Sequence, residues 1–245
     1  MTDHLPALPD AGIGRVLCVV AHPDDMEYGA SAAVAGWTGR GVAVTYLLLT
    51  HGEAGMSEEP ETVGPLRARE QERACRTVGV EDLRMFDHPD GMLEYGAELR
   101  GDIARVIREV QPDLVLTANF EVEAYGGLNQ ADHRVAGLAT IDAVRDAANP
   151  WVFRERLGEV EPWQAGAIAV AGHENPTHGV VVAPENVQAS VDSLSAHEAY
   201  LRHIGDHPEP GEFIPAILRA GGERLGVEHA VTLRVFDLGG LSATD

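Results

Sequence analysis

Residues 15–29 of the chain, RVLCVVAHPDDMEYG, join a short apolar run to a cluster of polar side chains. The run RVLCVVA is rich in β-branched residues, which is typical of a strand buried on both faces of a parallel sheet. His22, Asp24 and Asp25 follow it within four positions. We therefore expect functional side chains at the point where this strand ends.

Segments typical of strands and helices alternate from this run to about residue 149. Apolar runs predict further strands at residues 41–50, 82–88 and 113–119. Alanine-rich or amphipathic segments, some bounded by proline or glycine, predict helices at residues 27–40, 64–79, 98–112 and 132–149. This alternation predicts an α/β fold with a Rossmann-like, mostly parallel sheet and helices on both faces.

The pattern changes after Pro150. Residues 165–172 and 179–183 predict strands, a polar segment from about 185 to 203 predicts a helix, and residues 229–236 predict a last strand. We expect one domain over residues 1–245, with a core at about 14–149 and a C-terminal strand-helix cap at about 150–245 on the same sheet. A chain of this length buries a substantial core without disulfides.

Composition narrows the classes of function. The formal net charge of −21 opposes binding to nucleic acid and to anionic lipid, so a small-molecule substrate is the better prediction. All eighteen basic residues are arginine. The absence of lysine excludes Schiff-base chemistry and the lysine of phosphate-binding loops, and no G-x-S-x-G serine motif is present.

The N-terminal segment and the cysteines bear on where the protein works. MTDHLPALPD lacks the basic and apolar regions of a signal peptide, and no apolar run is long enough to span a membrane. Cys18 and Cys75 lie in a predicted strand and a predicted helix, where buried thiols are common. We expect a cytoplasmic protein without membrane contact. The oligomeric state stays open, a homo-oligomer included.

Ligands of open parallel sheets bind where the strands end at their carboxyl side. The loops after the first and fourth predicted strands should therefore face one crevice and bring together His22, Asp25 and His133. Two histidines and one carboxylate suit Zn²⁺ with an open position for water, and they also suit Fe²⁺. Because Asp24 and Asp25 are adjacent, one can bind the metal while the other meets the water. Taken singly, each aspartate could instead cap the following helix.

Beyond these residues, the chain resembles the LmbE-like, or PIG-L, zinc de-N-acetylases. The first motif is AHPDDMEYG, and a second, NQADHRVAG, follows more than 100 residues later. Between them, LLLTHGEAG, RAREQERACRTVGV and HPDGML are similar to other segments of the family, and SLSAHEAYL, with His197, resembles its C-terminal helix motif.

The resemblance implies a reaction and roles for individual residues. His22, Asp25 and His133 would bind zinc, and Asp24 would be the general base that lets water cleave an amide into an amine and acetate. Asp132 would support the metal site or lie near the oxyanion, although it could simply cap a helix. Arg69 would contact substrate hydroxyls or form a local salt bridge, and Glu27 fits the first motif or favours a helix N-terminus.

Gln130 departs from the family pattern. Many members have a histidine at this position, three residues before the last ligand. A glutamine donates a hydrogen bond but cannot deliver a proton. Asp24 would then serve as both base and acid, unless another group such as Tyr125 helps or activity is lost.

We predict a zinc-dependent N-deacetylase or amidase that acts on an N-acylated amino sugar or a related small metabolite. An amidase for a thiol conjugate or an antibiotic intermediate is the nearest alternative. A metal-binding protein without catalysis is a second alternative, and Gln130 keeps it open. A nucleotide-binding module is disfavoured because no G-x-G-x-x-G follows the first strand.

Overall fold

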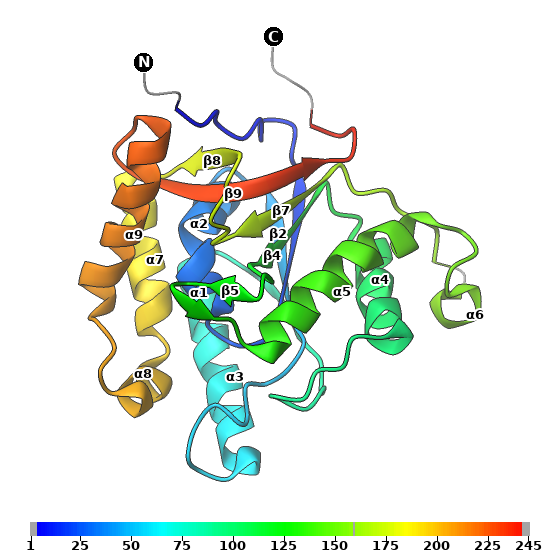
Figure 1. Ribbon diagram of the computed structural model, residues 1–245, viewed down its shortest axis with the longest axis horizontal. Coiled ribbons are helices and arrows are strands. Elements are labelled where there is room, and N and C mark those ends of the chain that lie inside the picture. Colours follow the sequence, from blue (N-terminus) through cyan, green and yellow to red (C-terminus); the bar gives the residue numbers. More distant parts are fainter. Residues whose placement is uncertain (1–3, 159, 242–245) are drawn as a thin grey trace.

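A seven-stranded sheet forms the centre of the protein, as a computed structural model of residues 4–158 and 160–241 shows (Figure 1). Among these residues, the strand order is β3-β2-β1-β4-β7-β9-β8. The strands are β1 (Arg15–Val20), β2 (Ala43–Leu48), β3 (Asp82–Met85), β4 (Leu114–Ala118), β7 (Ala167–Ala171), β8 (His178–Val181) and β9 (Ala230–Asp237). Neighbours from β3 to β7 are parallel, whereas β9 is antiparallel to β7 and β8. The predicted mostly parallel sheet is confirmed.

β1 is central because its side chains are apolar on both faces. Val16, Cys18 and Val20 pack into one hydrophobic cluster, and Leu17 and Val19 pack into the other. A strand between two cores of this kind needs an unbroken apolar sequence. The run RVLCVV meets that need.

Helices cover both faces of the sheet (Figure 1). One face carries α1 (Asp25–Gly29), α2 (Ser31–Gly39), α3 (Pro60–Thr77), α7 (Pro184–Ser195), α8 (Glu198–Ile204) and α9 (Pro210–Leu225). The other side carries α4 (Ala97–Val110), α5 (Ala131–Ala148) and the short α6 (Arg154–Leu157). Within the described residues, no helix combines the length and the apolar character needed to cross a bilayer.

The order of the strands places the loops after β1 and β4 side by side. The chain moves from β1 outward to β2 and β3, and α4 then returns it to β4 on the opposite side of β1. β1 and β4 pair in parallel, with Val19 opposite Thr117. Such a reversal opens a crevice at the carboxyl ends of the two strands. A small antiparallel hairpin, β5 (Glu123–Ala124) and β6 (Gly127–Leu128), extends the second of these loops.

The helices differ from the predicted segments at several places. Ala30 leaves the helical conformation, with φ of −147°, so the segment predicted at 27–40 is two helices, α1 and α2. The segment predicted at 185–203 is likewise divided, because the chain bends at His197 between α7 and α8. α9 was not predicted, because Pro210 and Pro215 are residues that usually interrupt a helix. Pro210 lies at the first turn, where proline is tolerated.

The C-terminal segment adds β7, β8 and β9 to the same sheet as β1 to β4. This arrangement is compatible with a cap built onto one sheet. The boundary near residue 149 and the single-domain organisation stay predictions.

Candidate active site and metal centre

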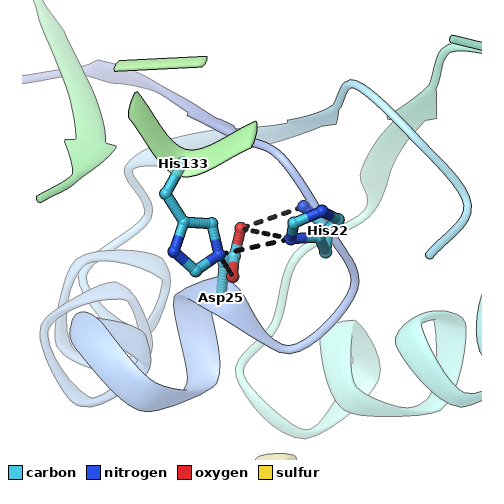
Figure 2. A group of neighbouring side chains, drawn as sticks. All are labelled: His22, Asp25 and His133. Atoms are coloured by element: carbon cyan, nitrogen blue, oxygen red, sulfur yellow. Dashed lines mark hydrogen bonds and ion pairs between the residues drawn. The ribbon is translucent and has the colours of Figure 1, made fainter. Parts of the chain in front are cut away.

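Three predicted ligands meet where β1 ends and α5 begins (Figure 2). Nε2 of His133 lies 3.0 Å from Oδ1 of Asp25, and Nδ1 of His22 lies 3.8 Å from Oδ2 of Asp25. The same two nitrogens of His22 and His133 are 3.2 Å apart. One donor atom from each residue lies within 4.8 Å of the others, so the three can hold one metal ion.

Hydrogen bonds on the far sides of the imidazole rings leave these nitrogens free to bind a metal. Nδ1 of His133 donates to Oδ1 of Asn129 at 3.0 Å, which leaves the Nε2 lone pair directed at Asp25. Nε2 of His22 lies 2.9 Å from Oδ1 of Asp90 and 3.4 Å from Oδ2 of Asp132. Such partners fix the ring orientation and tautomer of metal-binding histidines. The residues present therefore fit a metal ion.

The charges at this position also fit a cation. Burial lowers the pKa of His22, but its contacts with Asp132, Asp25 and Asp90 outweigh burial and raise it to about 12. Burial raises the pKa of Asp25, but the charge and hydrogen bond of His133 outweigh burial and hold the pKa well below its ordinary value. Several carboxylates thus surround two imidazoles, and a bound cation would offset their negative charge.

Asp24 is held apart from the three ligands by its backbone. Its φ of 82° lies in the left-handed region, which a non-glycine residue adopts at an energetic cost. Its N–H donates to Oε1 of Gln71 at 2.9 Å, and Nη2 of Arg67 lies 3.3 Å from its Oδ1. Burial, with the charge of Asp25, raises the pKa of Asp24 to about 7, although Arg67 opposes this. The two adjacent aspartates therefore have different surroundings, as their predicted roles require.

A cavity of about 480 Å³ connects these groups to solvent. His22, Asp24, Asp25, Gln130 and His133 all line it. Tyr125 also reaches it from the turn between β5 and β6, where Tyr125 and Gly126 have φ of 56° and 80°. Five predicted site residues thus meet at one cavity.

Asp132 lies behind His22 and does not line the cavity. Its carboxylate accepts hydrogen bonds from the backbone N–H groups of Gly91 and Leu93, at 2.7 and 3.1 Å. Among the described residues, its side-chain contacts are with these two N–H groups and with His22, and none is with an N–H group of α5. The carboxylate therefore ties the loop after β3 to the back of the His22 ring.

Two predicted substrate residues are not brought to the cavity. Glu27 is buried behind Asp24, where it accepts from Nε2 of Gln71 at 3.1 Å and from Oγ of Ser193 at 3.2 Å. His197 lies next to it, with Nε2 3.8 Å from Oε2 of Glu27. Arg69 is exposed on α3 and lies outside the cavity lining. Neither residue lines the cavity, and the substrate roles of Glu27 and Arg69 stay predictions.

Arg67, two positions before Arg69, is the arginine that lines the cavity. It is 2% exposed and donates to the carbonyl oxygens of Pro23 and Gly52. The resemblance to the family pointed to Arg69, and no sequence signal singled out Arg67 within RAREQE. Asp90 was also missed, although its His-Pro-Asp sequence repeats that of the first motif.

The chain is similar to several known proteins. A diacetylchitobiose deacetylase from Thermococcus kodakarensis is 29% identical over 195 residues, which cover 78% of this chain and 72% of the relative. A 1D-myo-inositol 2-acetamido-2-deoxy-alpha-D-glucopyranoside deacetylase from Kineococcus radiotolerans is 29% identical over 248 aligned residues, covering 79% and 68%. The solved N,N'-diacetylchitobiose deacetylase from Pyrococcus horikoshii superposes with a TM-score of 0.83 at 23% identity, over 95% of this chain and 86% of the other.

The family model described as PIG-L, GlcNAc-PI de-N-acetylase, matches residues 17–144. This range begins in β1 and ends in α5, so it contains the three candidate ligands His22, Asp25 and His133, which we name the triad. The resemblance carried by the two aspartate-histidine motifs is confirmed. The chain belongs to the PIG-L family of GlcNAc-PI de-N-acetylases.

Proposed function

We propose that this protein is a metal-dependent hydrolase that removes an acetyl group from an N-acetylated amino sugar or a related small metabolite. One observation carries the proposal. A two-histidine, one-carboxylate set and a separate buried carboxylate, Asp24, line the same cavity. The names of the relatives support an N-acetylated sugar as the substrate.

His22, Asp25 and His133 would hold the metal. We assign Zn²⁺ to this site, and Fe²⁺ is the alternative that the same donors accept. When bound, the metal supplies Lewis acidity to the amide carbonyl and lowers the pKa of water at the site.

Asp24 would move the protons. Its carboxylate takes a proton from the attacking water as the new C–O bond forms at the amide carbon. It then gives that proton to the nitrogen as the C–N bond breaks, so that an amine and acetate leave. Arg67 holds the carboxylate in place through the 3.3 Å contact. Gln130, at the cavity rim, would donate a hydrogen bond without transferring a proton.

We propose that the protein acts in the cytoplasm. Cys18 and Cys75 are buried free thiols, which suits a reducing compartment.

The proposed substrate is an amide of a small metabolite. A thiol conjugate or an antibiotic intermediate remains the alternative to an amino sugar.

Amine release tests the proposal directly. Purified protein, with its metal content quantified, is incubated with N-acetylated amino sugars and with acyl-amide conjugates, and the released amine is measured. The absence of lysine leaves little background for amine-reactive dyes. We expect release that stops on chelation and returns with zinc.

Two variants distinguish the roles of Asp24 and Gln130. Asp24→Asn should keep its metal and lose turnover, because the amide cannot accept the proton. Gln130→Ala should reduce turnover by no more than about tenfold, in line with the loss of one hydrogen bond. Equal losses from both variants would contradict the assignment of both proton transfers to Asp24. Stoichiometric metal without release from any substrate would favour a binding protein.

A further inference from the structure

Two kinds of side chain line the cavity. His22, Asp25 and His133 are polar, as are Asp24, Asp90, Arg67 and Gln130. The second kind, which we name the apolar wall, consists of Tyr28, Ala118, Tyr200, Phe213 and Ile217. α9 supplies its last two members, and α9 lies outside the residues 17–144 that match the family model. The α9 part of the apolar wall therefore lies beyond the region that matches the family model.

The apolar wall is held in place by its own contacts. The ring of Phe213 packs edge-on against Tyr28, with centroids 5.8 Å apart, and also against His207, at 5.4 Å. The hydroxyl of Tyr28 is 2.8 Å from Nε2 of His207. Tyr200 lies under the guanidinium of Arg67, 3.8 Å from the ring centroid. These rings present a preformed surface to a ligand, which lowers the entropic cost of binding.

Ile217 extends this surface toward solvent. It follows Phe213 by four positions on α9, so both side chains lie on one face of the helix. Ile217 is 42% exposed although it lines the cavity. An apolar group of a ligand that covered it would gain free energy in proportion to the area removed from water.

The charges of the cavity oppose an anionic substrate. Arg67 is the only arginine among the described residues that line it. Its Nη1 and Nη2 already donate to the carbonyl oxygens of Gly52 and Pro23, its Nε is buried out of reach of a ligand, and its Nη2 lies 3.3 Å from Oδ1 of Asp24. Asp25 and Asp90 add negative charge, and the chain as a whole carries −21. A carboxylate or phosphate on the substrate would find no free cationic side chain among the described lining residues.

We propose that the substrate is an uncharged N-acetylated amino sugar that carries an apolar alkyl or aryl group on its amine part, and that this group lies on the apolar wall. The inference rests on the proposed function and narrows it. The acetyl group points to the triad, since the hydrolysed bond must reach Asp24. The rest of the substrate then extends along the side of the cavity formed by α9.

A series of β-glycosides of N-acetylglucosamine tests the inference. The aglycones are methyl, butyl, hexyl and 3-carboxypropyl, the last carrying a charge in place of an apolar end. We expect kcat/KM to rise about threefold per methylene, or roughly 30-fold from methyl to butyl, mainly through KM, because a buried CH₂ contributes about 0.8 kcal/mol and the wall is partly open. The 3-carboxypropyl glycoside should be no better than the methyl glycoside.

Substitutions on α9 test whether Ile217 causes the rise of kcat/KM with aglycone length. Ile217→Ser should reduce the preference for butyl over methyl to about one third of its original size. Ile217→Arg should reverse the charge preference in favour of the 3-carboxypropyl glycoside. Ile204→Ser is the matched control, because Ile204 is 43% exposed and does not line the cavity. Ile204→Ser should leave kcat/KM unchanged for every glycoside of the series.

Binding to the Asp24→Asn variant separates this inference from the proposed function. Butyl binding more tightly than methyl, with no amine released by the wild type, would reject the deacetylase and keep the apolar wall as a ligand site. Equal affinities and equal turnover across the series would overturn the inference and leave the proposed function intact. A rise in kcat/KM with longer N-acyl chains, and none with longer aglycones, would also overturn the inference. The apolar group would then lie on the acyl part of the substrate and not on its amine part.

Discussion

Replacing Gln71 with methionine should lower kcat far more than it changes KM. Gln71 accepts the backbone N–H of Asp24 and donates to Oε1 of Glu27, and it does not line the cavity. Its amide therefore acts on the reaction through Asp24, whose left-handed backbone it holds. Methionine has a similar volume but cannot accept this hydrogen bond.

The magnitude follows from the lost contacts. A buried N–H without a partner costs about 1–3 kcal/mol. Release of the left-handed conformation, which costs roughly 1–2 kcal/mol in a non-glycine residue, recovers part of that. We expect a net loss of about 1 kcal/mol of stability and a fall of about 2–4 °C in Tm. Relaxation of Asp24 by about 1 Å would reduce kcat about 100-fold.

The assay combines steady-state kinetics, zinc quantification and thermal unfolding. Gln188→Met is the matched control, because Gln188 is exposed on α7 and donates only to Asp192. It should change stability by less than about 0.5 kcal/mol and leave kcat unaltered. A Gln71→Met protein that unfolds more readily but keeps its kcat would refute the positioning role. Loss of zinc from it would show that the triad had been disturbed instead.

Three further perturbations have defined outcomes. Arg67→Met should cost about 3–5 kcal/mol in urea unfolding and greatly reduce turnover, because the buried Asp24 loses its partner, whereas exposed Arg69→Met should change neither. Asp90→Asn should weaken zinc affinity about 10- to 100-fold in a chelator competition, with no change for Asp87→Asn, whose side chain is 98% exposed. Burial, helped by nearby arginines, lowers the pKa of His197 to about 3, whereas the unfolded chain takes up the proton near pH 6.5. Stability should therefore fall as the pH drops below about 6.5, and the wild type should lose about 2 kcal/mol more than His197→Gln between pH 7 and 5; identical pH profiles would argue against a buried neutral imidazole.

The sequence was most informative where one local pattern determined the result. β1 and β4 could be predicted because their runs are apolar on both faces, and two parallel strands bring the loops that follow them to one edge. That rule alone placed His22 near His133. The structure agrees with the predicted proximity, and the catalytic and metal-binding roles remain proposals.

Residues that depend on tertiary packing escaped prediction. α9 supplies two of the five residues of the apolar wall, yet Pro215 inside it obscures the helical pattern. Arg67 and Arg69 have the same side chain and differ only in the direction in which α3 points them. Gln71 is an ordinary helix residue in the sequence, and its importance depends on the backbone of Asp24, which is far away along the chain.

The separation of His22 and His133 along the chain would couple metal binding to the stability of the folded protein. They are 111 residues apart, so an ion bound to both would cross-link the chain as a disulfide does. The unfolded chain does not hold these donors together, and the ion would therefore favour the folded state by about 4 kcal/mol at a free concentration 1,000 times its Kd. Metal starvation would then increase the unfolded population that proteases degrade. A cell short of this metal would lose the polypeptide as well as its activity.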